Sequence, residues 1–133
     1  MKYLLGTDII IYWLNGDHQI EKKALDIGLE NIGFSIISKA ELFFGAYNSR
    51  HVKQNLKNVK RLSNTLSTIQ FDDKAAEIFG QLKSNLKKQG NIILDADIMI
   101  ASIALAHNLT LITNNVSHFK RIPALNSENW RDI

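Results

Sequence analysis

The chain has no cysteine and only one proline among its 133 residues. Without thiols it forms neither disulfides nor thiolate metal sites, which fits a reducing cytoplasm. Its apolar runs are far shorter than the roughly 20 residues that cross a bilayer. The N-terminal segment also lacks an extended apolar region followed by a small-residue cleavage site. We therefore expect a cytoplasmic protein with no signal peptide and no membrane contact.

An excess of charge of either sign is also missing. Sixteen lysines and arginines against thirteen acidic residues give a formal net charge of +3. This weak positive charge is compatible with a nucleic-acid partner, but many proteins without such a partner carry as much. The apolar share of 45% and the charged share of 22% are ordinary for a globular chain. Composition predicts one domain with a real core and leaves the function open.

Strand-like and helical segments alternate along the chain, without internal repeats. We expect a tail after Pro123 that is irregular or forms a short edge strand. Strands separated by helices predict an α/β fold, in which a parallel sheet is covered by helices on both faces. The expected strands are residues 3–5, 33–37, 68–71 and 109–113, and the expected helices are residues 8–15, 18–30, 38–47, 51–66, 73–89 and 95–107.

Side chains with oxygen atoms follow the predicted strands. Because the loops after parallel strands meet at one edge of a sheet, we expect these side chains to converge. Carboxylate and amide oxygens are the ligands of Mg²⁺ and Mn²⁺, and such ions assist phosphodiester hydrolysis. The side chains, in chain order with the adjoining glycine, are Gly6, Thr7, Asp8, Ser38, Glu41, Asp95, Asp97, Thr113, Asn114 and Asn115.

Each of these residues also has an ordinary structural interpretation. Ser38 and Glu41 match a capping box at a helix start. Asp95 is a natural N-cap, and Asp97 in a first turn complements the helix dipole. Residues 114–115 are common turn formers. Convergence at several strand ends favours the metal site over these separate interpretations.

Four stretches in the same order resemble PIN-domain ribonucleases, and more narrowly the VapC toxins of VapBC toxin–antitoxin systems. They cover the chain from end to end, so the resemblance implies a single PIN domain over residues 1–133. The stretches are LLGTDIIIY (Leu4 to Tyr12), SKAELFFGA (Ser38 to Ala46), DIMIASIA (Asp97 to Ala104) and LTLITNNVSHFKRIP (Leu109 to Pro123).

The resemblance implies a five-stranded parallel sheet and an endoribonuclease that depends on Mg²⁺ or Mn²⁺ and cuts structured RNA such as tRNA or rRNA. It also implies a homodimer, silenced by a cognate VapB-type antitoxin whose C-terminal segment blocks the metal site, with larger toxin–antitoxin assemblies as a further option. The family's catalytic, metal-binding positions are carried over to Gly6, Glu41, Asp97 and Asn115, with Thr7 and Thr113 as polar neighbours.

Gly6 departs from the family pattern. The motif normally reads L-D-T-N or L-D-T-D, whereas this chain has Gly6 in place of the first aspartate. Asp8 is expected to cap a helix rather than replace the missing acid. The alternative is a turn glycine that needs a positive φ. Because Mg²⁺ relies on a few well-placed anionic ligands, we expect poor metal binding and little or no nuclease activity.

Two origins of Gly6 fit this expectation. In the first, an original aspartate was replaced, either deliberately or by selection against an active toxin during cloning. In the second, the chain is a natural, catalytically weakened homologue that acts as an antitoxin-bound regulatory or RNA-binding protein. A DNA nuclease of the flap-endonuclease class is a further alternative, although those chains are longer.

Two sets of residues are candidates for contacts with partners. Phe43, Phe44 and Tyr47 are candidates for a dimer or antitoxin surface, with burial in the core as the alternative. Basic residues are candidates for holding the RNA backbone, with a solvated helix face as the alternative. These are Lys53, Lys57, Lys60, Arg61, Lys83, Lys87, Lys88, Lys120 and Arg121.

Overall fold

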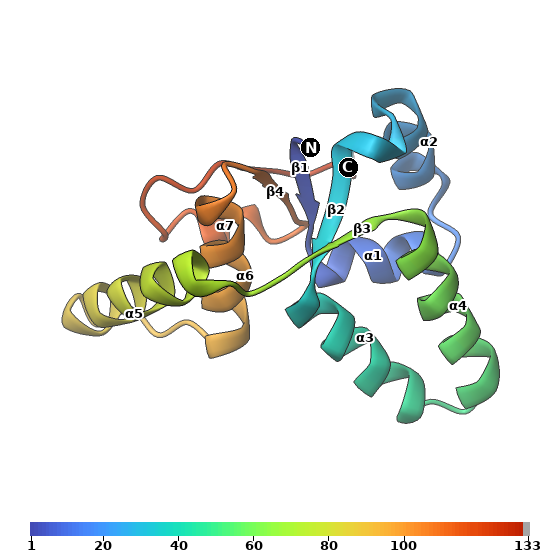
Figure 1. The fold of residues 1–133 in the computed structure, drawn as a ribbon, viewed down its shortest axis with the longest axis horizontal. Helices are drawn as coiled ribbons and strands as arrows, with labels where there is room; N and C mark the ends of the chain where they lie inside the picture. Colours follow the sequence, from blue (N-terminus) through green and yellow to red (C-terminus); the bar gives the residue numbers. More distant parts are fainter. Residues whose placement is uncertain (132–133) are drawn as a thin grey trace.

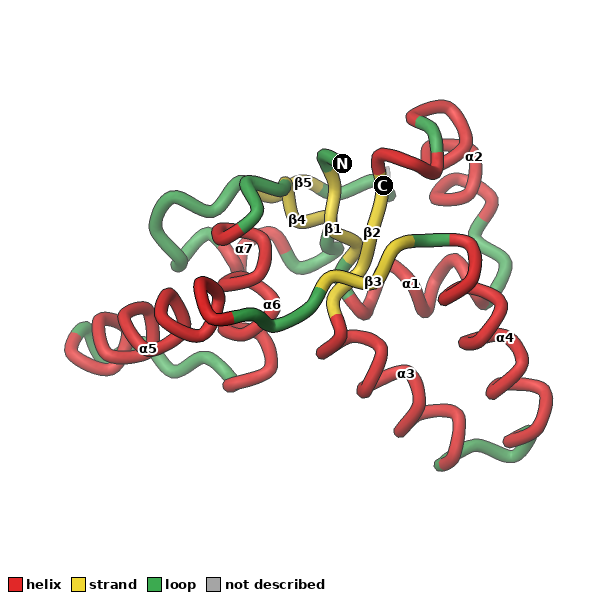
Figure 2. The backbone as a smooth tube through the Cα atoms, viewed as in Figure 1, coloured by secondary structure: helices red, strands yellow, loops and turns green. Residues whose placement is uncertain are grey.

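A computed structural model describes residues 1–131 of the chain. Within these residues, five short strands form one sheet in the order β3-β2-β1-β4-β5 (Figure 2). Every neighbouring pair of strands is parallel. The parallel sheet predicted from the sequence is confirmed. The strands are β1 (Tyr3–Leu5), β2 (Ile32–Ser35), β3 (Ser67–Ile69), β4 (Thr110–Ile112) and β5 (Ser127–Glu128).

Helices connect the strands and pack on the sheet (Figure 1). None of the helices in residues 1–131 is both long enough and apolar enough to cross a membrane. They are α1 (Thr7–Leu14), α2 (His18–Ile27), α3 (Ile36–Tyr47), α4 (Val52–Thr65), α5 (Asp73–Lys88), α6 (Asp95–Ala106) and α7 (Val116–Phe119), with a 3₁₀ turn at Leu29–Asn31.

The strands send alternate side chains into two apolar layers, one on each face of the sheet. In β1, Leu4 packs with residues of α5 and α6, whereas Leu5 packs with residues of α1 to α4. Leu111 and Ile112 in β4 divide in the same way, and all four side chains are fully buried. Burying each such side chain contributes about 1.5–3 kcal/mol. Helices therefore cover both faces, as predicted.

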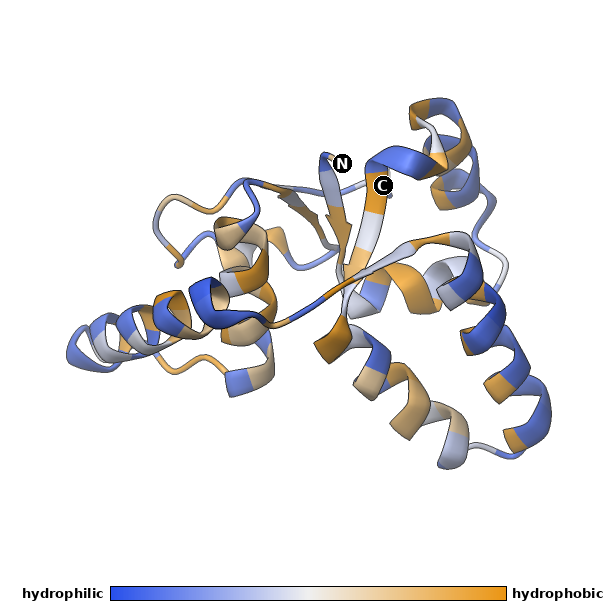
Figure 3. Cartoon of the chain, viewed as in Figure 1, coloured by the Kyte–Doolittle hydropathy of each residue, from blue (hydrophilic) through white to orange (hydrophobic). Residues whose placement is uncertain are grey.

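The helices differ in how much of their surface is apolar. Most of α6 is buried, and it is coloured as hydrophobic along most of its length in Figure 3. By contrast, α4 and α5 are hydrophilic on their outer sides (Figure 3) and bury only one stripe each. The buried helix α6 carries Asp97 in its first turn, so this acid starts from a well-anchored position.

Several predicted boundaries were wrong. Helix α2 was expected to reach residue 30, but it ends at Ile27 because Gly28 adopts a φ of +98° that breaks the helix. Helix α3 was expected to start at Ser38, but it starts at Ile36. Ser35 is its N-cap, and the Ser35 Oγ accepts a hydrogen bond from the Ser38 backbone N–H (2.9 Å).

Two local interpretations are corrected as well. Ser38 and Glu41 do not form a capping box, because Ser38 lies inside α3. Asp95 is not the N-cap of α6; Leu94 holds that place, and Asp95 forms an ion pair with Lys83 (2.9 Å). The short helix α7, which follows residues 114–115, was not predicted from the sequence.

Candidate active site

A pocket of about 200 Å³ opens beside the carboxyl ends of β1 and β4. The four positions carried over from the family pattern, Gly6, Glu41, Asp97 and Asn115, all line it. The structure thus brings together residues that are up to 109 positions apart in the chain. The remaining lining residues are Thr7, Asp8, Ile100, Thr113 and Phe119.

Gly6 has an ordinary extended backbone, with φ −69° and ψ 159°. Its N–H donates to the Ile112 carbonyl (2.7 Å), continuing the pairing of β1 with β4. A turn glycine with positive φ, the alternative considered above, is therefore wrong. A Cβ at this position would lie 2.9 Å from the backbone carbonyl oxygen of Ile112 and 3.0 Å from Asp8 Oδ1, so the main chain at Ile112 must move to admit a side chain.

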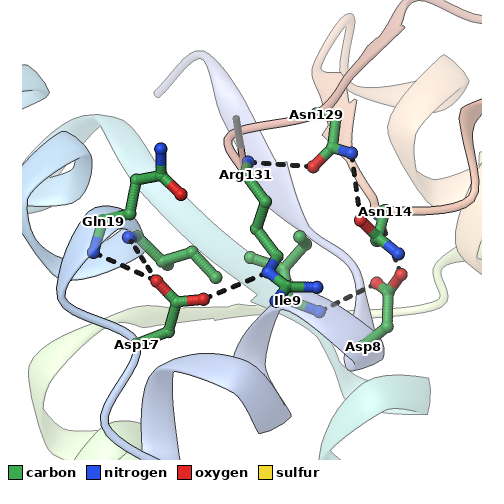
Figure 4. A network of polar contacts seen from close by, with 8 residues as sticks. Asp8, Ile9, Asp17, Gln19, Asn114, Asn129 and Arg131 are labelled. Atoms are coloured by element: carbon green, nitrogen blue, oxygen red, sulfur yellow. Dashed lines mark hydrogen bonds and ion pairs between the residues drawn. The ribbon is translucent and has the colours of Figure 1, made fainter. Parts of the chain in front are cut away.

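Asp8 uses both carboxylate oxygens within the protein (Figure 4). Oδ1 accepts from the Ile9 N–H (2.8 Å), while Oδ2 accepts from the Asn114 N–H (2.9 Å) and the Thr113 hydroxyl (3.1 Å). Asp8 lies in the first turn of α1, as expected, and it also ties this helix to the loop after β4. These bonds hold Asp8 in a structural role.

A line of hydroxyl groups leads to Glu41. The Thr7 Oγ1 lies 2.7 Å from Glu41 Oε1 and 2.8 Å from the Ser38 Oγ, which in turn lies 3.2 Å from the Ser35 Oγ. A carboxylate only accepts and each hydroxyl has one proton, so Ser35 donates to Ser38, Ser38 to Thr7, and Thr7 to Glu41. Both serines are fully buried. This line fixes the exposed Glu41 carboxylate at the pocket.

Asp97 is held from the opposite side by a histidine. His118 Nε2, on α7, lies 3.1 Å from Asp97 Oδ2. The side chains of His118 and Asp97 are 21% and 30% exposed. Arg121 bonds the other ring nitrogen of His118, Nδ1. Sequence reasoning assigned no role to His118, although the H-F-x-R spacing places Arg121 three residues after it.

Asn115 is the N-cap of α7 and borders the pocket with an exposed side chain. Its N–H donates to the Thr113 hydroxyl oxygen (3.0 Å), and that hydroxyl donates to Asp8. The loop that presents Asn115 is thus anchored through Thr113, which is 1% exposed.

The lining residues fit Mg²⁺ or Mn²⁺ in kind, because their side-chain donors are carboxylate, amide and hydroxyl oxygens. The lining residues include too few free carboxylates for a strong metal site. Within residues 1–131 there is no group of three or more acidic, histidine or cysteine side chains placed to hold a metal ion. Beside Asp8, which is bonded internally, Glu41 and Asp97 are the carboxylates that line the pocket.

A family model and related proteins assign this chain to the same family. A model of the PIN domain matches residues 3–125. The chain is 38% identical over 132 residues to Ribonuclease VapC2 of Rickettsia felis, and 28% identical over 130 residues to the tRNA(fMet)-specific endonuclease VapC of Salmonella typhimurium. Each alignment covers 98% of this chain and 98% of the relative.

Solved structures of VapBC proteins have the same fold as this chain. VapBC2 from Rickettsia felis bound to a promoter DNA fragment matches with a TM-score of 0.90 at 38% identity, covering 98% of this chain and 100% of that one. DNA-bound VapBC from Salmonella typhimurium matches with a TM-score of 0.94 at 29% identity, covering 98% and 99%. The chain therefore belongs to the PIN-domain family and, within it, to the VapC ribonuclease family.

Proposed function

We propose that this chain has the scaffold of a VapC toxin, a Mg²⁺- or Mn²⁺-dependent endoribonuclease for structured RNA such as tRNA or rRNA, and that Gly6 impairs this copy. One observation carries the proposal: positions 6, 41, 97 and 115 surround a single pocket at the carboxyl edge of the sheet. The ribonuclease names of relatives at 28–38% identity support RNA as the substrate, rather than DNA.

The remaining residues have distinct proposed roles. Glu41 and Asp97 supply the anionic oxygens of the metal site, and Asn115 supplies an amide oxygen. A divalent ion held by these residues would supply an activated water and would offset the phosphate charge. Thr7 orients Glu41 through its hydroxyl. Without a carboxylate at position 6, the site has too little negative charge for a cation that gives up its water reluctantly.

Exposed basic residues on α4, on α5 and just after α7 are the proposed contacts to the RNA backbone. Arg121 is less suitable than expected, because its guanidinium bonds His118 and the Ile92 carbonyl within the protein. Lys83 already pairs with Asp95. The residues retained as candidates are Lys53, Lys57, Lys60, Arg61, Lys87, Lys88 and Lys120, all with exposed side chains.

The proposed partners are a VapB-type antitoxin and a second copy of the chain. Phe44 and Tyr47, on α3, are 71% and 67% exposed, which supports a partner surface rather than burial for these two residues. Phe43 instead packs against the core. The similarity to structures of VapBC complexes supports the antitoxin as partner.

Restoring the acid tests the proposal directly. We expect Gly6→Asp to cleave tRNA in the presence of Mg²⁺ or Mn²⁺ at a rate at least tenfold above the unaltered chain, on the order of the effect of one well-placed charged group. Gly6→Asn is the matched control, because it adds a side chain of the same size without the charge, and we expect it to stay as slow as the unaltered chain.

Equal rates for the unaltered chain and a folded Gly6→Asp variant would contradict impairment by Gly6. The alternative, an antitoxin-bound regulatory or RNA-binding protein, is favoured by the shortage of carboxylates. It predicts that both proteins bind RNA or antitoxin equally and that neither cleaves RNA.

A further inference from the structure

We propose that His118, locked by Arg121, is a positioning residue that holds Asp97 through one carboxylate oxygen and leaves the other oxygen for the metal ion. This inference rests on the proposed metal site and goes beyond it, because it assigns a supporting pair outside the ligand positions. The observation behind it is the continuous contact from Arg121 through the His118 ring to Asp97.

The tautomer of His118 follows from its partners. A guanidinium only donates hydrogen bonds, so the Nδ1 of His118 must accept from Arg121 and carries no proton. The ring proton therefore sits on Nε2, which points at Asp97 Oδ2 at 3.1 Å. The opposite tautomer would set a protonated Nδ1 against the N–H of Arg121, so that two donors would face each other without an acceptor. Arg121 therefore favours the tautomer in which Nε2 donates to Asp97.

Arg121 is itself fixed by main-chain contacts. Its Nε donates to the His118 carbonyl (3.1 Å), and its Nη1 donates to the Ile92 carbonyl (3.3 Å) in the segment that leads into α6. One guanidinium therefore joins α7 to the segment that precedes the helix carrying Asp97. The His118 ring also meets the Phe119 ring edge-on, with centroids 5.0 Å apart.

The consequence concerns how Asp97 binds a cation. With Oδ2 engaged by His118, the Oδ1 of Asp97 is the oxygen that would remain to hold a cation. Groups that orient a ligand in this way affect metal affinity by about 10- to 100-fold when they are removed.

The first test reads the tautomer and needs neither metal nor activity. Nitrogen-15 NMR of the imidazole ring in the unaltered chain is expected to show protonated Nε2 and bare Nδ1 for His118. Arg121→Gln removes the guanidinium donor at Nδ1 and leaves only the Asp97 carboxylate to favour protonated Nε2, so we expect it to weaken this preference. A His118 ring protonated at Nδ1 would overturn the proposal whether or not the chain binds metal.

The second test measures Mn²⁺ affinity by electron paramagnetic resonance in the Gly6→Asp background. His118→Phe keeps the ring and removes the donor, so we expect about 10-fold or greater weakening. His118→Gln keeps an N–H donor and should recover most of the affinity. His107→Phe is the matched control, since His107 pairs with a different acid, Asp72 (3.1 Å), and should leave affinity unchanged.

The outcomes separate the two proposals. Mn²⁺ affinity that is equal in Gly6→Asp and Gly6→Asp/His118→Phe would overturn the role of His118 and leave the metal site standing. A folded Gly6→Asp protein that neither binds Mn²⁺ nor cleaves RNA would instead count against the proposed function, and the NMR result alone would then decide the Arg121–His118–Asp97 contact.

Discussion

At the scale of single residues, hydrogen-bond donors hold two carboxylates of the pocket, those of Glu41 and Asp97, in place. Glu41 is exposed, yet its carboxylate accepts a hydrogen bond from Thr7, the last of a line of hydroxyls that includes two buried serines. The Asp97 carboxylate accepts one from His118. Two acids on different helices are thus each held by a neutral donor, and this arrangement fixes their direction without neutralising their charge.

Thr7 offers a test of this support. Thr7→Val removes the donor to Glu41 and the acceptor for the buried Ser38, so we expect a loss of about 0.5–1.5 kcal/mol in the free energy of unfolding, measured by urea titration. In the Gly6→Asp background it should also weaken Mn²⁺ binding. Thr7→Ser keeps the hydroxyl and should behave like the parent; if both variants lose the same amount, the hydroxyl line has no role.

At the scale of elements, sequence patterns predicted the order of strands and helices well, because buried stripes repeat with the period of each structure. Boundaries failed where two candidates competed. Ser35 and Ser38 both suit an N-cap, and Ser35 holds that place because β2 ends there. The contact of His118 with Asp97 joins residues 21 positions apart and leaves no periodic signal, so only the fold reveals it.

Helix α5 gives a prediction about acid. The Ala75 N–H, which donates to the N-cap Asp72 (2.9 Å), and then His107 lower the pKa of Asp72 below its usual value of 3.8. A lowered folded-state pKa means that the carboxylate stabilises the fold above the unfolded-state pKa, and that this contribution is lost as pH falls through the folded-state pKa.

Asp72→Asn keeps a capping oxygen but cannot ionise. We expect it to have a lower thermal midpoint than the unaltered chain at about pH 6, with the difference disappearing as the pH falls below 3.8, the usual Asp72 value. Thermal melts followed by circular dichroism across this range measure it. A difference that stays constant with pH would contradict the assignment.

At the scale of the whole molecule, the C-terminal segment closes the structure onto its beginning (Figure 4). Asn129 donates to the Asn114 side chain (3.0 Å), next to the site, and Arg131 pairs with Asp17 (3.1 Å) between α1 and α2. The Arg131 guanidinium also lies 3.8 Å from the centre of the Tyr12 ring. The last described residues thus brace the loop that carries Asn115.

Arg131 is therefore expected to stabilise the fold. Arg131→Ala should lower the free energy of unfolding by about 0.5–2 kcal/mol, the range of a partly desolvated cation–π contact. Arg131→Lys keeps the charge but loses the planar group, and should recover only part of this. Urea unfolding measures both. An alanine variant as stable as the parent would contradict a stabilising role for the Arg131 side chain.

The extended backbone of Gly6 has a genetic consequence. A glycine codon becomes an aspartate codon by one change at its second base when the third base is a pyrimidine. Since this residue sits in β geometry that other residues adopt, its backbone conformation allows such a change, but the Ile112 carbonyl has to move to make room for the Cβ. Under the proposed function, cells without antitoxin would select the inactive chain with glycine at position 6. A single base change to aspartate would then restore the active toxin.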